Sequence, residues 1–207
     1  GTPWLANYSV NNGNTKFIIL NNTRLLAYIS SDTEVIIPAG INFIGKNVFT
    51  GNTSITSVDF SALNNWLQIP NNAFNGCTAL SSVTLTGWIE ETGIDAFKGT
   101  SWFNLLSNNT AYIVGNNDDN IRLLFFKGIA PDGEYSVPLD VTHIGTNAFY
   151  GSGITSLTML NPTPCSLGRG DVLQGITTIN VPNLNALTSY TNNSFWTPYR
   201  SYLRVAP

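Results

Sequence analysis

The stretch Ile44-Gly45-Lys46-Asn47-Val48-Phe49-Thr50-Gly51 recurs along the chain and decides its fold. Three further copies share its aromatic residue and closing glycine, at 69–76, 92–99 and 144–151, and a shorter fifth copy lies at 171–175. The repeat positions Phe49, Phe74 and Phe97 follow one another at intervals of 23 to 25 residues. A fixed period in the twenties is typical of a solenoid, in which each repeat buries its apolar face against the next.

A second pattern follows each copy, as in Ile55-x-x-Val58-x-Phe60 and Leu80-x-x-Val83-x-Leu85. Its apolar residues alternate with Ser, Thr, Asp or Asn, and this period of two predicts a half-buried strand. We therefore expect one short strand from each repeat, at 54–61, 80–86 and 153–160, stacked into a parallel sheet on one side. The repeat Phe residues are expected to point inward and stack, and the repeat glycines, such as Gly45 and Gly51, to occupy tight bends.

The polar positions of these strands are expected on the outer face of the sheet, where they form a row of short side chains with little charge. This row is either a solvated surface that prevents aggregation or a contact face for a protein or glycan, because solenoids bind ligands on such extended surfaces. On the second interpretation the candidate ligand-binding residues are Ser57, Asp59, Ser82, Thr84, Ser156, Thr158, Thr178 and Asn180.

The motif I-G-x-x-A-F-x-G followed by L-x-x-V-x-L resembles the BspA-like leucine-rich repeats of secreted bacterial surface proteins. The resemblance extends over nearly the whole chain, although Leu63 and Trp88 stand where common leucine-rich repeats carry Asn or Cys. It implies a mainly β leucine-rich repeat solenoid located outside the cell or on its outer surface, with its signal peptide removed. It also implies adhesion to a host protein or a neighbouring extracellular protein.

The sequence contains an internal duplication in which residues 2–60 correspond to 100–160. Arg24-Leu25-Leu26-Ala27-Tyr28, for example, matches Arg122-Leu123-Leu124-Phe125-Phe126. We expect one continuous domain over 1–207. Because the first residues match those that follow the third repeat, we also expect at least one more repeat upstream in the native protein.

Each duplicate carries a predicted β-hairpin, inserted between repeats. The first joins 16–20 to 24–30 through Asn21-Asn22-Thr23, and the second joins 111–115 to 121–127. Asn and Asp at the tips suit hairpin turns. The pair Asp118 and Asp119 therefore favours a turn over a calcium site, because no spaced loop of oxygen ligands surrounds it.

Residues 183–207 are expected to form a short helical C-terminal cap that covers the last repeat. Asn183 is the expected N-cap of a helix with apolar positions at helical spacing. The aromatic run that follows, from Phe195 to Leu203, is expected to cover the core. A sugar-stacking site in the same run is the alternative.

Composition excludes several classes of function. With 10% charged residues, a net charge of −3 and no basic run, the chain lacks the footprint of a nucleic-acid binder. No apolar stretch reaches the roughly 18 residues of a membrane span. Cys77 and Cys165 lie several repeats apart, farther than the ~7 Å between Cα atoms that a disulfide allows, so we expect no bridge.

Catalysis has little support in the sequence. The one histidine, His143, is expected at a surface position, and Glu90 and Glu91 are adjacent and do not face each other across a cleft. No nucleophile motif, zinc-protease motif or phosphate-binding loop occurs. We therefore expect no enzyme, cofactor or metal site. The interpretations left open are an adhesin, a glycan-binding accessory protein and a passive spacer.

Overall fold

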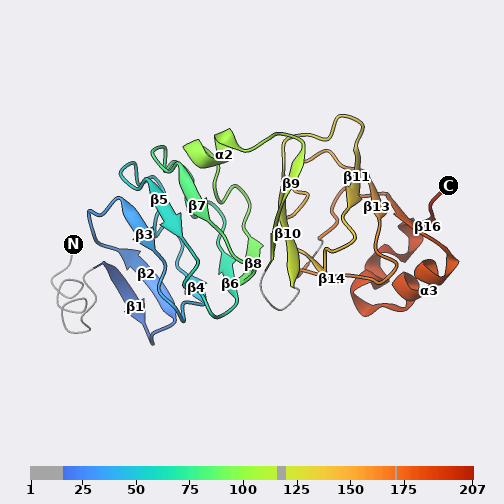
Figure 1. Ribbon diagram of the computed structural model, residues 1–207, viewed down its shortest axis with the longest axis horizontal. Coiled ribbons are helices and arrows are strands. Elements are labelled where there is room, and N and C mark those ends of the chain that lie inside the picture. Colours follow the sequence, from blue (N-terminus) through green and yellow to red (C-terminus); the bar gives the residue numbers. More distant parts are fainter. Residues whose placement is uncertain (1–15, 116–119, 171) are drawn as a thin grey trace. The chain divides into compact units, whose positions relative to one another are not determined.

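The computed structural model describes residues 16–115, 120–170 and 172–207 (Figure 1). The described residues form two compact units, which divide between Leu106 and Ser107. Each unit consists mostly of short strands. The first contains β1 (Phe17–Leu20), β2 (Arg24–Tyr28), β3 (Glu34–Ile36), β4 (Phe43–Ile44), β5 (Ser57–Asp59), β6 (Leu67–Ile69), β7 (Ser82–Thr84), β8 (Ile89–Thr92) and the helix α2 (Ser101–Leu105).

The second unit begins with a similar series of strands and then adds two helices and a last strand. It contains β9 (Thr110–Gly115), β10 (Ile121–Lys127), β11 (Glu134–Val137), β12 (His143–Ile144), β13 (Ser156–Met159), β14 (Ser166–Leu167), β15 (Thr178–Val181), the helix α3 (Leu184–Asn192), the 3-10 helix η1 (Ser194–Tyr202) and β16 (Leu203–Val205).

Among the described residues, each unit holds two sheets, whereas the sequence pattern predicted a single one. The predicted strands are β5, β7 and β13, and they lie in the sheets β3-β5-β7 and β11-β13-β15-β16, which are parallel throughout. A second parallel ladder, β2-β4-β6-β8 in one unit and β10-β12-β14 in the other, is built from the residues around each repeat motif. Each repeat therefore contributes two short strands, separated by turns.

The repeat phenylalanines stack as predicted in the first unit. The ring centroids of Phe49 and Phe74 are 4.9 Å apart, and those of Phe74 and Phe97 are 5.2 Å apart, with nearly parallel planes. The column ends on Trp102 of α2, whose ring meets Phe97 edge to face at 4.9 Å. The aromatic rings thus form a continuous core through three repeats.

Threonine and serine hydroxyl groups link successive repeats by hydrogen bonds to backbone carbonyls. The Thr56 hydroxyl donates to the Thr33 carbonyl, and the Ser81 hydroxyl donates to the Thr56 carbonyl, at 3.2 and 3.4 Å. The Thr177 hydroxyl makes the same bond to the Thr155 carbonyl in the second unit. The accepting carbonyls of Thr33, Thr56 and Thr155 directly precede β3, β5 and β13, so these bonds help to satisfy backbone groups at the start of each strand.

The predicted strands are shorter than expected because side chains cap both ends. At the start of the 54–61 segment, Asn52 Oδ1 accepts bonds from the backbone N–H groups of Ser54 and Ile55. At its end, Asp59 Oδ1 accepts a bond of 2.7 Å from the N–H of Ser61. Turns therefore replace strand pairing on either side of β5.

Both predicted hairpins are confirmed. Strands β1 and β2 pair antiparallel, as do β9 and β10, and each pair has a register shift, at Leu26 and at Leu124. In the three-residue connection between Leu20 and Arg24, Asn21 and Asn22 have φ values of 52° and 58°, the left-handed conformation that Asn tolerates in turns. Asp118 and Asp119, weighed above for calcium, lie outside the described residues.

The repeat glycines fulfil two different requirements. Gly51 and Gly76 have positive φ values, as expected for tight bends. Gly45 is not in the left-handed region, which corrects the expectation for this position; a Cβ there would lie 3.3 Å from the Leu25 carbonyl oxygen. Close approach of two backbones therefore explains Gly45.

The C-terminal helix begins where predicted. Asn183 is the N-cap of α3, and its Oδ1 accepts a 2.9 Å bond from the N–H of Ala186. Tyr190 and Trp196 are fully buried, and the Trp196 indole N–H donates to the carbonyl of Cys165 at 2.8 Å. Strand β16, which the sequence did not predict, then adds to the edge of the sheet beside β15. That this segment caps a solenoid stays a prediction.

Candidate functional site

Four of the eight candidate residues lie on one sheet of the first unit. Ser57 pairs with Ser82, and Asp59 pairs with Thr84, across β5 and β7. The intervening Val58 and Val83 point into the core, so the polar side chains face outward. Ser82 and Thr84 are exposed, whereas Ser57 and Asp59 are half-buried.

The other four candidate residues lie on the corresponding sheet of the second unit. Ser156 pairs with Thr178, and Thr158 pairs with Asn180, across β13 and β15. All four are half-buried. The Thr178 hydroxyl accepts a 2.8 Å bond from the guanidinium group of Arg204 on β16. The structure thus brings the candidates together as two groups of four, and one continuous stripe stays a prediction.

The sequence interpretation missed the outer strands that extend both groups. Glu34 and Ile36 on β3 lie opposite Ser57 and Asp59, and Ile36 is 60% exposed. Glu134 on β11 lies opposite Ser156 in the same way. The duplication offered a signal, because 34–37 and 134–137 match each other, but neither segment follows a copy of the repeat motif at the usual distance.

His143 is buried, which corrects the surface position expected from the sequence. Only 8% of it is exposed, and its Nδ1 lies 2.8 Å from the hydroxyl oxygen of Ser166 on the neighbouring strand. Burial, and secondarily the nearby positive charge of Arg122, lowers the pKa of His143 from 6.5 to about 4. The imidazole is therefore neutral at physiological pH.

The two cysteines are buried free thiols. Cys77 Sγ donates to the carbonyl of Phe49 at 3.0 Å. Burial raises the pKa of the Cys77 thiol and raises the pKa of Cys165 to about 12. Neither group is therefore a thiolate nucleophile at neutral pH.

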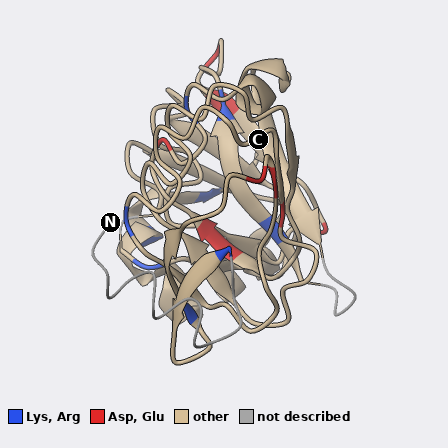
Figure 2. Ribbon diagram, turned by 90° about the vertical axis from the view of Figure 1, so that its left-hand side faces the viewer, with Lys and Arg blue, Asp and Glu red and all other residues tan. Residues whose placement is uncertain are grey.

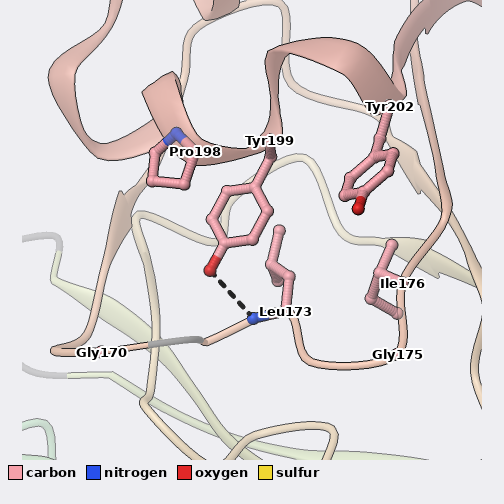
Figure 3. A pocket seen from close by; sticks show the side chains of 7 residues that line it. All are labelled: Gly170, Leu173, Gly175, Ile176, Pro198, Tyr199 and Tyr202. Atoms are coloured by element: carbon pink, nitrogen blue, oxygen red, sulfur yellow. Dashed lines mark hydrogen bonds between the residues drawn. The ribbon is translucent and has the colours of Figure 1, made fainter.

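A pocket of about 440 Å³ is lined by residues of the last repeat and of the helix η1 (Figure 3). The Tyr199 hydroxyl accepts a 3.3 Å bond from the N–H of Leu173, which fixes that ring in the wall of the pocket. Tyr202 lies on the opposite side, near Ile176, and is 37% exposed. Pro198 and two glycines, Gly170 and Gly175, complete the lining.

Charged residues are sparse along the chain, as the mostly tan ribbon of Figure 2 shows. Among the described residues, no group of three or more His, Cys, Asp or Glu side chains is placed to hold a metal ion. In the same part of the chain, no helix is long and apolar enough to cross a membrane.

Comparison with solved structures finds low similarity to three bacterial proteins. The chain is 15% identical to a leucine-rich cell surface protein of Faecalibacterium prausnitzii A2-165, covering 79% of this chain and 73% of that one, with a TM-score of 0.34. It is 13% identical to the pneumococcal vaccine antigen PcpA (73% and 51% covered, TM-score 0.33). It is 15% identical to a leucine-rich repeat protein of Bacteroides ovatus (80% and 68% covered, TM-score 0.27).

Comparison with protein families shows the family to which the chain belongs. No curated protein matches the chain. The BspA type leucine-rich repeat region, however, matches in six copies, over residues 22–118, 64–165 and 108–198. These matches cover most of the sequence and include every repeat described above. The chain therefore belongs to the BspA-type leucine-rich repeat family.

Proposed function

We propose that this chain is a non-catalytic bacterial surface module that binds a host protein or a neighbouring extracellular protein. The contact would be made by the two groups of four candidate residues, on β5 and β7 and on β13 and β15, which we call the outer polar rows. The observation that carries the proposal is the strand register, which places Ser57 beside Ser82 and Asp59 beside Thr84. Side chains on adjacent strands lie about 4.8 Å apart, so the register presents a regular array of hydroxyl and carboxylate groups.

The composition of this array suits a protein ligand. Hydroxyl groups donate and accept hydrogen bonds, and they lose little side-chain entropy when they are immobilised. Ile36, 60% exposed at the end of the row that contains Asp59 and Thr84, adds an apolar contact. Glu34 and Glu134 place a carboxylate at the corresponding end of each sheet. Apolar contacts with polar surroundings are the usual composition of a protein interface.

The test is a solid-phase binding panel of the purified chain against extracellular matrix proteins. The first variant carries Ser82→Lys and Thr84→Lys, and the second carries Thr158→Lys and Asn180→Lys. The matched control carries Thr53→Lys and Asn65→Lys, which are exposed positions outside the strands. Binding by the parent and the control, with loss in either outer-row variant, supports the proposal. Equal binding by all four proteins moves recognition away from the outer rows.

A glycan-binding role is the second candidate, and the pocket beside Tyr202 favours it. A half-exposed tyrosine ring next to backbone exposed by glycines can stack on a sugar ring while its hydroxyl hydrogen-bonds. A glycan array with the parent and Tyr202→Ala tests this role. If the parent binds neither proteins nor glycans, a passive spacer is the remaining function.

A further inference from the structure

The outward side of the first hairpin differs from the polar rows in its chemistry. Leu20, Arg24 and Phe43 lie opposite one another across β1, β2 and β4, and Leu26 occupies the register shift of the same hairpin. We call these four residues the hairpin face. They come from a different sheet than the outer polar rows.

The duplication supplies an equivalent set in the second unit. Val114, Arg122 and His143 lie opposite one another across β9, β10 and β12, and Leu124 occupies the corresponding register shift. The two sets therefore hold matching positions on matching strands.

Exposure differs at every one of the four positions. Leu20, Leu26 and Phe43 are 39%, 40% and 37% exposed, and Arg24 is exposed as well. Their counterparts Val114, Leu124 and His143 are 8%, 0% and 8% exposed, and Arg122 is 8% exposed. These four positions are therefore covered in the second unit and exposed in the first.

The hairpin face also has the composition of an interaction hot spot. Aromatic and arginine side chains are enriched in interfaces, and clustered apolar side chains supply the area that binding removes from water. The Arg24 guanidinium carbon lies 4.0 Å from the centre of the Phe43 ring. A guanidinium group over an aromatic ring keeps the planar set of N–H donors that can bind a carboxylate in a bidentate manner.

We propose that the hairpin face is a docking surface for an acidic, apolar segment of a protein partner. A carboxylate of that segment pairs with Arg24, and neighbouring aliphatic or aromatic side chains cover Leu20, Leu26 and Phe43. We choose an acidic partner segment because Arg24 is the sole charged side chain among the four, and its positive charge is complementary to a carboxylate. This inference rests on the proposed protein-binding function and places its strongest contact on the hairpin.

The test begins with a phage-displayed random peptide library, selected on the full chain and counter-selected on the Arg24→Glu, Leu26→Lys double variant. Enriched peptides are synthesised and titrated against single variants. We expect a shared Asp or Glu next to apolar residues. Arg24→Glu and Leu26→Lys should each weaken binding at least about tenfold. Leu184→Lys, at a leucine 71% exposed on α3, should leave the affinity unchanged.

A charge swap makes the test specific. A peptide whose acidic residue is replaced by Lys should lose affinity for the parent and regain it for Arg24→Glu. Thermal unfolding of each variant separates loss of binding from loss of folding. Arg24→Lys, which keeps the charge without the planar fork, should bind with intermediate affinity.

Three results would overturn the proposal. The first is enriched peptides that lack an acidic residue or bind Arg24→Glu as tightly as the parent. The second is self-association of the parent in sedimentation that Leu26→Lys abolishes, since the occupant is then a second copy. The third is a matrix protein whose binding is lost in the outer-row variants and unchanged in Leu26→Lys. This third result refutes the hairpin face and leaves the proposed function standing, whereas a parent that binds no protein refutes both.

Discussion

The ring of Phe97 lies parallel to the ring of Phe74, with an angle of 1° between their planes and 5.2 Å between their centres. Phe74 meets Phe49 on its other face at 4.9 Å. Phe60 adds an edge-to-face contact at 6.2 Å. Phe74 is thus the centre of the aromatic column, and none of its surface is exposed.

Phe74→Ala is expected to destabilise the chain by about 3–5 kcal/mol, because it removes the ring and leaves a cavity between two repeats that cannot close around it. Urea denaturation followed by tryptophan fluorescence measures the change. The control is Phe195→Ala, at a phenylalanine 50% exposed, which should change the unfolding free energy by less than about 0.5 kcal/mol. Equal losses in the two variants would contradict the central position of Phe74.

Gly93→Ala is expected to lower the melting temperature sharply. A Cβ at Gly93 would overlap the backbone of Pro70 and Asn71, and backbone atoms move only with the whole repeat. Gly115→Ala is the matched control, since a Cβ there meets one side-chain carbon at 3.7 Å, an ordinary contact. Differential scanning calorimetry on the two variants checks the prediction, and a tolerated Gly93→Ala would show that the two repeats separate at low cost.

The sequence predicted the repeat and its core more completely than the second sheet. Phe49 and Phe74 recur with a clear period, and the 54–61 segment alternates long enough to indicate a strand. Strands such as β4, Phe43–Ile44, are too short to show any periodicity, so hydrogen bonds to neighbouring repeats define them. Local pattern contains no signal for such pairings.

The candidate site could also be predicted only in part from the sequence. The outward direction of Ser82 and Thr84 follows from alternation alone and agrees with the structure. The burial of His143 does not follow from its sequence, because its counterpart Phe43 is 37% exposed in an equivalent strand. Tertiary packing, which differs between the two duplicates, decides which of the two positions is covered.

The cysteines are expected to resist modification in the folded chain. Burial raises the pKa values of both thiols, so the thiolate population near neutral pH is smaller than for an exposed cysteine, and access is restricted as well. An aromatic disulfide reagent should label neither Cys77 nor Cys165 in buffer and both in denaturant. The single variants Cys77→Ala and Cys165→Ala assign any signal to one thiol. Rapid labelling of the folded protein would contradict the burial of the modified residue.

His143 should make the stability of the chain depend on pH below neutrality. Its pKa is about 4 in the folded state against 6.5 for the free group, so the unfolded chain binds a proton that the folded chain excludes between these values. The unfolded state then holds more protons, and stability falls as the pH decreases from about 6.5 to about 4. The loss from this residue should be about 3 kcal/mol and should level off below pH 4. This pH-dependent loss of stability should disappear in His143→Phe, which introduces the side chain found at the equivalent position 43.

Chemical denaturation of both proteins across this pH range measures the difference, and Ser166→Ala tests the contribution of the bond to Nδ1. Parallel pH profiles for the parent and His143→Phe would show that the buried imidazole takes up its proton without a cost to folding.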